Sequence, residues 1–121
     1  MEIKFVYTAL QVRNINKAER FYTKILGMKR VARKLVKETK GEMCILKLGD
    51  AGLELNKYTG QKNRRGNNLD HLSFKVDNLE SLIKKVKSKH VHIYDYIETD
   101  RWKRCFIADP DGNWIELYQH L

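Results

Sequence analysis

The sequence is poor in proline and cysteine, with one proline and two cysteines among 121 residues. This scarcity of proline, together with 42% apolar residues, argues against long disordered segments and favours a compact core. No apolar run approaches the roughly 20 residues that a membrane-spanning helix needs, so we expect no membrane association. Residues 1–6 lack the basic and then apolar layout of a signal peptide. We therefore expect a cytoplasmic protein whose two cysteines are free thiols.

Acidic residues are in the minority. The 24 lysines and arginines outnumber the 15 aspartates and glutamates, which gives a formal net charge of +9. Such a charge attracts anions, including nucleic acids and phosphorylated or carboxylated small molecules. The lysines are spread along the whole chain, and the sequence has no helix-turn-helix, zinc-finger or RNP-like motif. These features favour a small anionic molecule over nucleic acid as the partner.

The chain contains an internal repeat, in which residues 7–15 match residues 71–79. Each copy is an alternating stretch that ends in valine, followed by any residue, an asparagine and an aliphatic residue. Asn14 and Asn78 are predicted to cap helices, because an asparagine side chain accepts hydrogen bonds from the first free backbone N–H groups. Apolar residues then recur at helical spacing: Ala18, Phe21, Tyr22, Ile25 and Leu26 in the first copy, and Leu79, Leu82, Ile83 and Val86 in the second. Gly27 is predicted to end the first helix.

The repeat continues through the strands that follow each predicted helix. The matching segments are residues 44–46 with 105–107 and residues 52–55 with 114–117. A turn precedes the last strand of each copy: Gly49-Asp50 in the first, and the stronger hairpin signal Asp109-Pro110-Asp111-Gly112 in the second. Each half therefore consists of a strand, a helix and three further strands.

This pattern predicts an α+β fold made of two tandem βαβββ modules that form cupped mixed sheets. The modules span about residues 1–60 and 67–121, and the polar residues 60–68 are predicted to join them as a surface linker. Neither half is long enough to bury a core alone, so residues 1–121 are expected to form a single domain.

Strand parity places two glutamates on the same side of the predicted sheets as Tyr7 and His71. Side chains alternate between the two faces of a strand, so the apolar neighbours of Glu54 and Glu116 must face the helices. Those neighbours are Leu53, Leu55, Ile115 and Leu117. If the two modules pair with their free faces together, Tyr7, Glu54, His71 and Glu116 line one concavity. A histidine and two carboxylates that converge form either a metal-ligand set or an acid–base set.

Three segments of the sequence carry a family resemblance: residues 21–28, the pair Asp70-His71 and residues 109–117. Together with the repeat, they resemble the vicinal oxygen chelate superfamily of glyoxalase I, bleomycin-resistance and extradiol dioxygenase proteins. The resemblance extends over essentially the whole chain. Among the branches of the superfamily, the sequence looks most similar to glyoxalase I (lactoylglutathione lyase).

The resemblance implies a divalent metal ion, Ni, Co, Zn or Mn, held by Glu54, His71 and Glu116. Tyr7 occupies the fourth ligand position, where glyoxalase I carries His or Gln. A neutral phenol, with a pKa of about 10, is a poor ligand for an ordinary divalent ion, so Tyr7 could instead line the pocket or donate a hydrogen bond. The tyrosine also removes the two-His-one-carboxylate set of an Fe(II) dioxygenase, which disfavours dioxygenase chemistry.

The resemblance further implies a metal-dependent lyase or isomerase that moves a proton between adjacent carbons of a substrate with vicinal oxygens. Glu116 and its repeat mate Glu54 are the candidate catalytic carboxylates, and Glu116 is the preferred base because its strand follows the tighter turn. Gln11 and Tyr58 stand where glyoxalase I carries the Arg and Asn that hold glutathione, which leaves the substrate open. The alternative is a metal-free protein of the bleomycin-resistance type that binds a small molecule.

The short family members that the chain resembles also imply a homodimer in which each site draws ligands from both subunits. Cys44 and Cys105 occur in apolar runs and are predicted to be core residues rather than nucleophiles. Basic residues beside Trp102 could hold the anionic tail of a substrate or face water. These are Arg101, Lys103 and Arg104.

Overall fold

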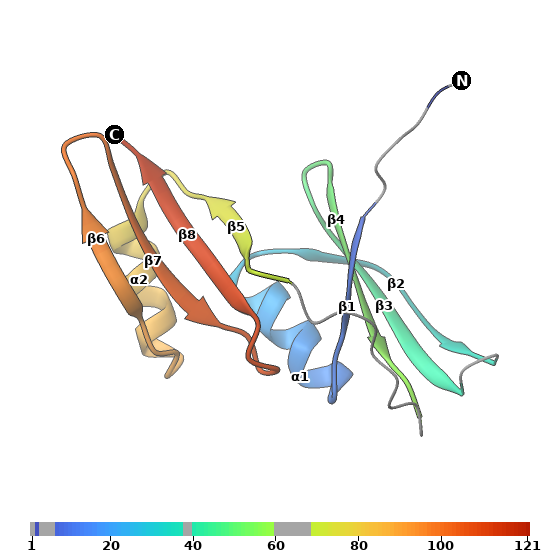
Figure 1. The fold of residues 1–121 in the computed structure, drawn as a ribbon. Coiled ribbons are helices and arrows are strands. Elements are labelled where there is room, and N and C mark those ends of the chain that lie inside the picture. The colour runs from blue at the N-terminus through green and yellow to red at the C-terminus, as the bar shows by residue number, and fades with distance from the viewer. Residues whose placement is uncertain (1, 3–6, 38–39, 60–68) are drawn as a thin grey trace. The chain divides into compact units, whose positions relative to one another are not determined.

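A computed structural model describes residue 2 and residues 7–37, 40–59 and 69–121. Over this part of the chain the structure is α+β, as the sequence predicts (Figure 1). It divides into two compact units, Met1–Arg65 and Gly66–Leu121. The predicted linker, residues 60–68, lies outside the described residues. None of the helices in the described segments is long and apolar enough to cross a membrane.

The first unit, in its described residues, is a four-stranded mixed sheet with one helical segment. In chain order its elements are β1 (Thr8–Gln11), α1 (Ile15–Arg20), η1 (Phe21–Ile25), β2 (Lys29–Val36), β3 (Gly41–Leu48) and β4 (Ala51–Lys57). The strands lie in the order β1-β4-β3-β2, with β1 parallel to β4 and the other pairs antiparallel. The π-helical segment η1 continues α1, which packs against β3 and β4.

The second unit repeats this arrangement. Its elements are β5 (Leu72–Lys75), α2 (Leu79–Ser88), β6 (Tyr94–Glu98), β7 (Trp102–Ala108) and β8 (Trp114–His120). The strand order is β5-β8-β7-β6, with β5 parallel to β8 and the other pairs antiparallel (Figure 1). Since this order is the one found in the first unit, the predicted βαβββ repeat is confirmed.

Both helices begin at the predicted asparagines. The Asn14 side-chain oxygen accepts a hydrogen bond from the backbone N–H of Lys17 at 3.0 Å, and that of Asn78 accepts one from Ser81 at 3.1 Å. These bonds satisfy N–H groups that the first turn of a helix leaves without an intrahelical partner. Gly27 has a φ of 76°, so the helical segment of the first unit ends on a left-handed glycine, as predicted.

The strand register is equivalent in the two units. Glu54 of β4 pairs with Ala9 of β1, and Glu116 of β8 pairs with Ser73 of β5. The repeat seen in the sequence is therefore a repeat of hydrogen-bonded positions. It places the two candidate glutamates at matching points of two separate sheets.

The core of each unit lies between its sheet and its helix. The predicted helix-facing residues Leu53, Leu55, Ile115 and Leu117 are all buried. Cys44 and Cys105 are fully buried free thiols, as predicted. Burial raises the pKa of Cys105 to about 11, and burial together with a hydrogen bond to Glu19 raises the pKa of Cys44 to about 12. Both thiols are therefore protonated near neutral pH and act as core residues.

Strand β8 begins after a turn that Asp109 organises. Asp109 is buried, with 5% of the residue exposed. Its carboxylate accepts hydrogen bonds from the backbone N–H groups of Asp111 and Asn113 at 2.9 and 2.7 Å, and from Asn113 Nδ2 at 2.9 Å. Gly112 has a φ of 84°, a conformation that glycine adopts without strain. The turn therefore fixes the start of β8 and, with it, the position of Glu116.

Replacing Asp109 with alanine should lower the free energy of unfolding by about 2–3 kcal/mol, because the change removes buried charge-assisted hydrogen bonds. Urea unfolding followed by circular dichroism measures this loss. Asp50→Ala is the matched control, since Asp50 is exposed in the equivalent turn of the first unit. We expect the control to change the free energy by less than about 0.5 kcal/mol. Equal losses in the two variants would contradict this role for Asp109.

Candidate functional site

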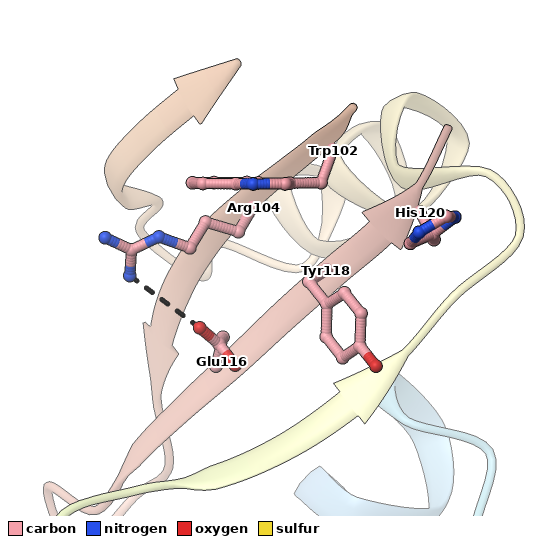
Figure 2. A pocket seen from close by; sticks show the side chains of 5 residues that line it. All are labelled: Trp102, Arg104, Glu116, Tyr118 and His120. Carbon is pink, nitrogen blue, oxygen red and sulfur yellow. Dashed lines mark ion pairs between the residues drawn. The ribbon is translucent and has the colours of Figure 1, made fainter. Parts of the chain in front are cut away.

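The face of the second sheet that points away from α2 carries an array of polar and aromatic side chains. Three cross-strand pairs between β7 and β8 form it: Trp102 with His120, Arg104 with Tyr118, and Phe106 with Glu116. The residues between them, such as Cys105 and Leu117, are buried in the core. Because side chains alternate along a strand, all six members of the array share one face. Figure 2 shows five of them gathered above β7 and β8.

Glu116 lies among three groups that can interact with its carboxylate. Ser73 Oγ donates a hydrogen bond to Glu116 Oε1 at 2.8 Å. His71 Nε2 lies 3.8 Å from the same oxygen, and Arg104 Nη1 lies 3.7 Å from Oε2 (Figure 2). The Glu116 side chain remains 20% exposed. The carboxylate is thus held in orientation and can still be reached by a ligand.

His71 is oriented by its neighbour in the sequence. Its Nδ1 lies 2.6 Å from Asp70 Oδ2. An ionised carboxylate only accepts hydrogen bonds, so Nδ1 carries the proton and Nε2 of the neutral ring has the free lone pair. The ring also meets Phe106 edge-on, with their centroids 5.4 Å apart. A carboxylate that fixes the tautomer in this way is typical of a metal-binding histidine.

A pocket of about 440 Å³ opens over the array. It is lined by Trp102, Arg104, Glu116, Tyr118 and His120 (Figure 2). The guanidinium of Arg104 lies over the Phe106 ring at 5.1 Å and over the Trp102 ring at 5.9 Å. Distances below about 6 Å allow cation–π attraction, so the two rings hold the arginine in place. The pocket therefore combines one acid, one fixed cation and aromatic walls.

In the first unit, Glu54 forms its own hydrogen-bonded cluster. Asn56 Nδ2 donates to Glu54 Oε2 at 2.8 Å. The negative charge of Glu54 and a hydrogen bond to its carboxylate raise the pKa of Tyr7 above the usual 10.0. Tyr7 is therefore a neutral phenol that donates a hydrogen bond. In this structure Tyr7 therefore has the donor role that the sequence allowed.

Two of the predicted metal ligands, His71 and Glu116, lie together. An ion bound at the usual distances of about 2.0–2.2 Å would hold two neighbouring ligand atoms about 2.8–3.6 Å apart. His71 Nε2 and Glu116 Oε1 are separated by 3.8 Å, so a small side-chain movement would bring them into this range. No cluster of three or more His, Cys, Asp and Glu side chains suited to a metal occurs within the described residues. Glu54 and Tyr7 belong to the first unit, so their convergence with the other two residues stays a prediction.

Sequence reasoning assigned no role to three polar residues of this face. Ser73 follows His71 by two positions and pairs in register with Glu116, so its hydroxyl reaches the carboxylate. Tyr118 and His120 follow Glu116 at intervals of two along β8. The same parity that identified the glutamates could have indicated all three. Which of them touch one another depends on the register between strands.

The family model of the Glyoxalase/Bleomycin resistance protein/Dioxygenase superfamily matches residues 4–117. The chain therefore belongs to this superfamily, as its motifs predict. The match extends over both units of the chain. It includes all the residues singled out from the sequence as ligands: Tyr7, Glu54, His71 and Glu116.

The similar proteins include several named lactoylglutathione lyase. That of Schizosaccharomyces pombe is 26% identical over 94% of this chain, but the chain spans only 46% of the yeast protein. That of Neisseria meningitidis serogroup A is 28% identical over 97% of this chain and 91% of its own length. The solved structure of the trypanothione-dependent glyoxalase I of Leishmania major superposes with a TM-score of 0.82 at 25% identity, covering 98% of this chain and 87% of that one. These similarities confirm the glyoxalase-like fold.

Proposed function

We propose that the protein is a glyoxalase I-like lyase or isomerase that depends on a divalent metal. It would move a proton between adjacent carbons of a small molecule with vicinal oxygens. The main support for this proposal is that His71 Nε2 lies 3.8 Å from the Glu116 carboxylate, beside an open pocket. Relatives named lactoylglutathione lyase support the same activity.

His71, Glu116 and Glu54 are the residues that would hold the metal, which we propose to be Ni, Co, Zn or Mn. When bound, a divalent ion supplies positive charge that stabilises negative oxygens developing on the substrate. The His71 tautomer set by Asp70 keeps a lone pair directed out of the ring at Nε2. Ser73 holds one oxygen of Glu116, which limits the rotation of the carboxylate.

Glu116 is the proposed general base. Its carboxylate borders the pocket, so a substrate carbon can approach one of its oxygens. The carboxylate would take the proton from this carbon, keep it on an oxygen, and return it to the adjacent carbon. The Asp109 turn fixes β8, and a base must hold its geometry closely to be effective. Glu54 is the second candidate for this step.

The experiment that tests the proposal is turnover by metal-loaded protein. Methylglyoxal is supplied with glutathione or with another low-molecular-weight thiol, such as mercaptoacetate, and thioester formation is followed. We expect turnover that a chelator abolishes and that added Ni, Co, Zn or Mn restores. If no thiol supports turnover in the metal-loaded protein, the enzymatic proposal is wrong.

The second candidate is a metal-free protein that binds a small molecule, as bleomycin-resistance proteins do. The identity of Tyr7 favours it, because a phenol, which is a poor ligand for a divalent ion, stands where glyoxalase I carries His or Gln. The aromatic walls of the pocket suit such a role as well. Ligand binding with equal strength in chelator-treated and metal-loaded protein would support this candidate.

Replacing Tyr7 with histidine should raise the affinity for the divalent metal by about tenfold or more, because a neutral imidazole is a better ligand than a phenol. Isothermal titration calorimetry measures the change. Tyr7→Phe is the matched control, since it removes the hydroxyl without adding a ligand, and we expect its affinity to stay near that of the wild type. An unchanged affinity in Tyr7→His would show that this position lies outside the ligand set.

We also propose a homodimer whose sites draw ligands from both subunits. The edge strand β2 carries the exposed apolar residues Val31 and Leu35, which a partner could cover. Light scattering at micromolar concentration should give twice the chain mass of 14.3 kDa. A monomer under these conditions would contradict the assembly.

The proposed location is the cytoplasm. Cys44 and Cys105 are buried free thiols, which a reducing compartment preserves. A fluorescent fusion of the full-length protein should be found there.

A further inference from the structure

Arg104 brings a positive charge into the pocket and leaves most of its hydrogen-bond donors unused. A guanidinium has five N–H donors. Within the part of the chain that the structure describes, its ion pairing is the single contact with Glu116 at 3.7 Å. This distance is longer than the about 2.7–2.9 Å of a charge-assisted hydrogen bond. With its side chain 28% exposed, Arg104 can offer these donors to a ligand.

The direction of the Arg104 side chain is already fixed. The rings of Phe106 and Trp102 lie 5.1 and 5.9 Å from the guanidinium carbon. The side chain extends from β7 toward Glu116 on β8 (Figure 2). A cation held by two aromatic rings loses little conformational freedom when it binds an anion. Arg104 is therefore a preorganised anion-binding group beside the proposed base.

The distance between Arg104 and Glu116 determines how close the carboxylate and the reacting carbon of a substrate can lie. A carbon that gives its proton to Glu116 lies about 3–3.5 Å from a carboxylate oxygen. An anionic group on Arg104 lies about 2.8 Å from a guanidinium nitrogen. Because Arg104 Nη1 and Glu116 Oε2 are only 3.7 Å apart, a short molecule can occupy both positions. The pocket volume of about 440 Å³ also suits a small ligand.

We infer that Arg104 determines substrate specificity by binding a carboxylate that lies a few bonds from the reacting carbon. The inference rests on the proposed function, since it takes Glu116 as the base. The carboxylates of glutathione lie many bonds from the reacting carbon of its hemithioacetals. A short mercapto acid places its carboxylate close to that carbon. The preferred thiol component is therefore a short mercapto acid.

The test is a binding measurement that needs neither metal nor turnover. The probes are acetonylthioacetate, an unreactive thioether that combines a carbonyl with a nearby carboxylate, and its uncharged methyl ester. Both are titrated calorimetrically into chelator-treated, full-length protein. We expect the acid to bind about tenfold to a hundredfold tighter than the ester, because the acid gains charge-assisted hydrogen bonds.

Arg104→Met should remove this preference, so that the acid binds about as weakly as the ester does. Arg104→Lys, which keeps the charge, should retain part of the preference, and it replaces the Met variant if that variant fails to fold. Arg101→Met is the matched control, since Arg101 is exposed, does not line the pocket, and loses the same charge.

Three results would overturn the inference: equal affinities for acid and ester, equal losses in Arg101→Met and Arg104→Met, or no binding of the acid. A metal-loaded protein without turnover would instead contradict the proposed function. In that case the protein would still bind the acid more tightly than the ester.

Discussion

Replacing Glu116 with glutamine is expected to lower the isomerase rate by roughly a hundredfold or more. Glutamine keeps the shape of the side chain and one oxygen that can accept the hydrogen bond from Ser73. It cannot take a proton at neutral pH, so the chemical step loses its base. Folding should be preserved, because the residue lies on the open face of the sheet rather than in the core. Steady-state rates at saturating metal measure the effect.

Glu54→Gln is the matched variant, because Glu54 occupies the equivalent register position in the first unit. We expect it to weaken metal binding but to reduce the rate at saturating metal less than Glu116→Gln does. We expect this difference because the buried Asp109 turn anchors β8, the strand that carries Glu116. If Glu54→Gln causes the larger loss at saturating metal, the proton is carried by Glu54 instead. An unchanged rate in Glu116→Gln would rule out its role as base.

Replacing His71 with alanine is expected to weaken divalent metal binding by at least about a hundredfold, which abolishes stoichiometric uptake. His71 is the nitrogen donor of the proposed set, and its Nε2 lies beside the Glu116 carboxylate. Removing it leaves carboxylates, which bind Ni, Co and Zn less tightly than a mixed site does. Calorimetric titration with the metal ion alone measures the change, independently of any substrate.

His120→Ala is the control for this experiment. His120 lies on the same face of the sheet and lines the same pocket. It pairs with Trp102 at the far end of the array from Glu116. We expect its loss to leave metal affinity within about twofold of the wild type, because its position is outside the proposed ligand set. Stoichiometric metal binding that persists in His71→Ala would refute the ligand assignment.

Local features of the sequence were sufficient to predict the elements of the fold. The asparagine caps and Gly27 determine where helical segments begin and end through interactions a few residues apart. Alternation of apolar and polar residues determines which face of each strand is buried, and so it placed Glu54 and Glu116 on the open faces. The repeat predicted that both halves contain the same elements, and in the structure the two halves share one strand order.

The contacts within the site could not be predicted in the same way. The position of Arg104 between two rings and the hydrogen bond from Ser73 to Glu116 depend on register between strands far apart in the sequence. The sequence left open whether the basic residues beside Trp102 hold an anion or face water. In the structure Arg104 lines the pocket, whereas Lys103 pairs with Glu80 of α2 at 3.4 Å. The π-helical segment η1 also has no clear signal in the sequence.

The most direct test of a metal-dependent activity is the metal content of the full-length protein. The protein is purified without chelator, and its bound metal is measured. It is then stripped of metal and titrated calorimetrically with Ni, Co, Zn and Mn in turn. We expect about one ion bound per chain for at least one of these metals, with release of protons from any ligand that is protonated in the metal-free protein. No stoichiometric binding of any of the four ions to the folded protein would contradict a metal-dependent isomerase and would leave the metal-free binding protein as the function.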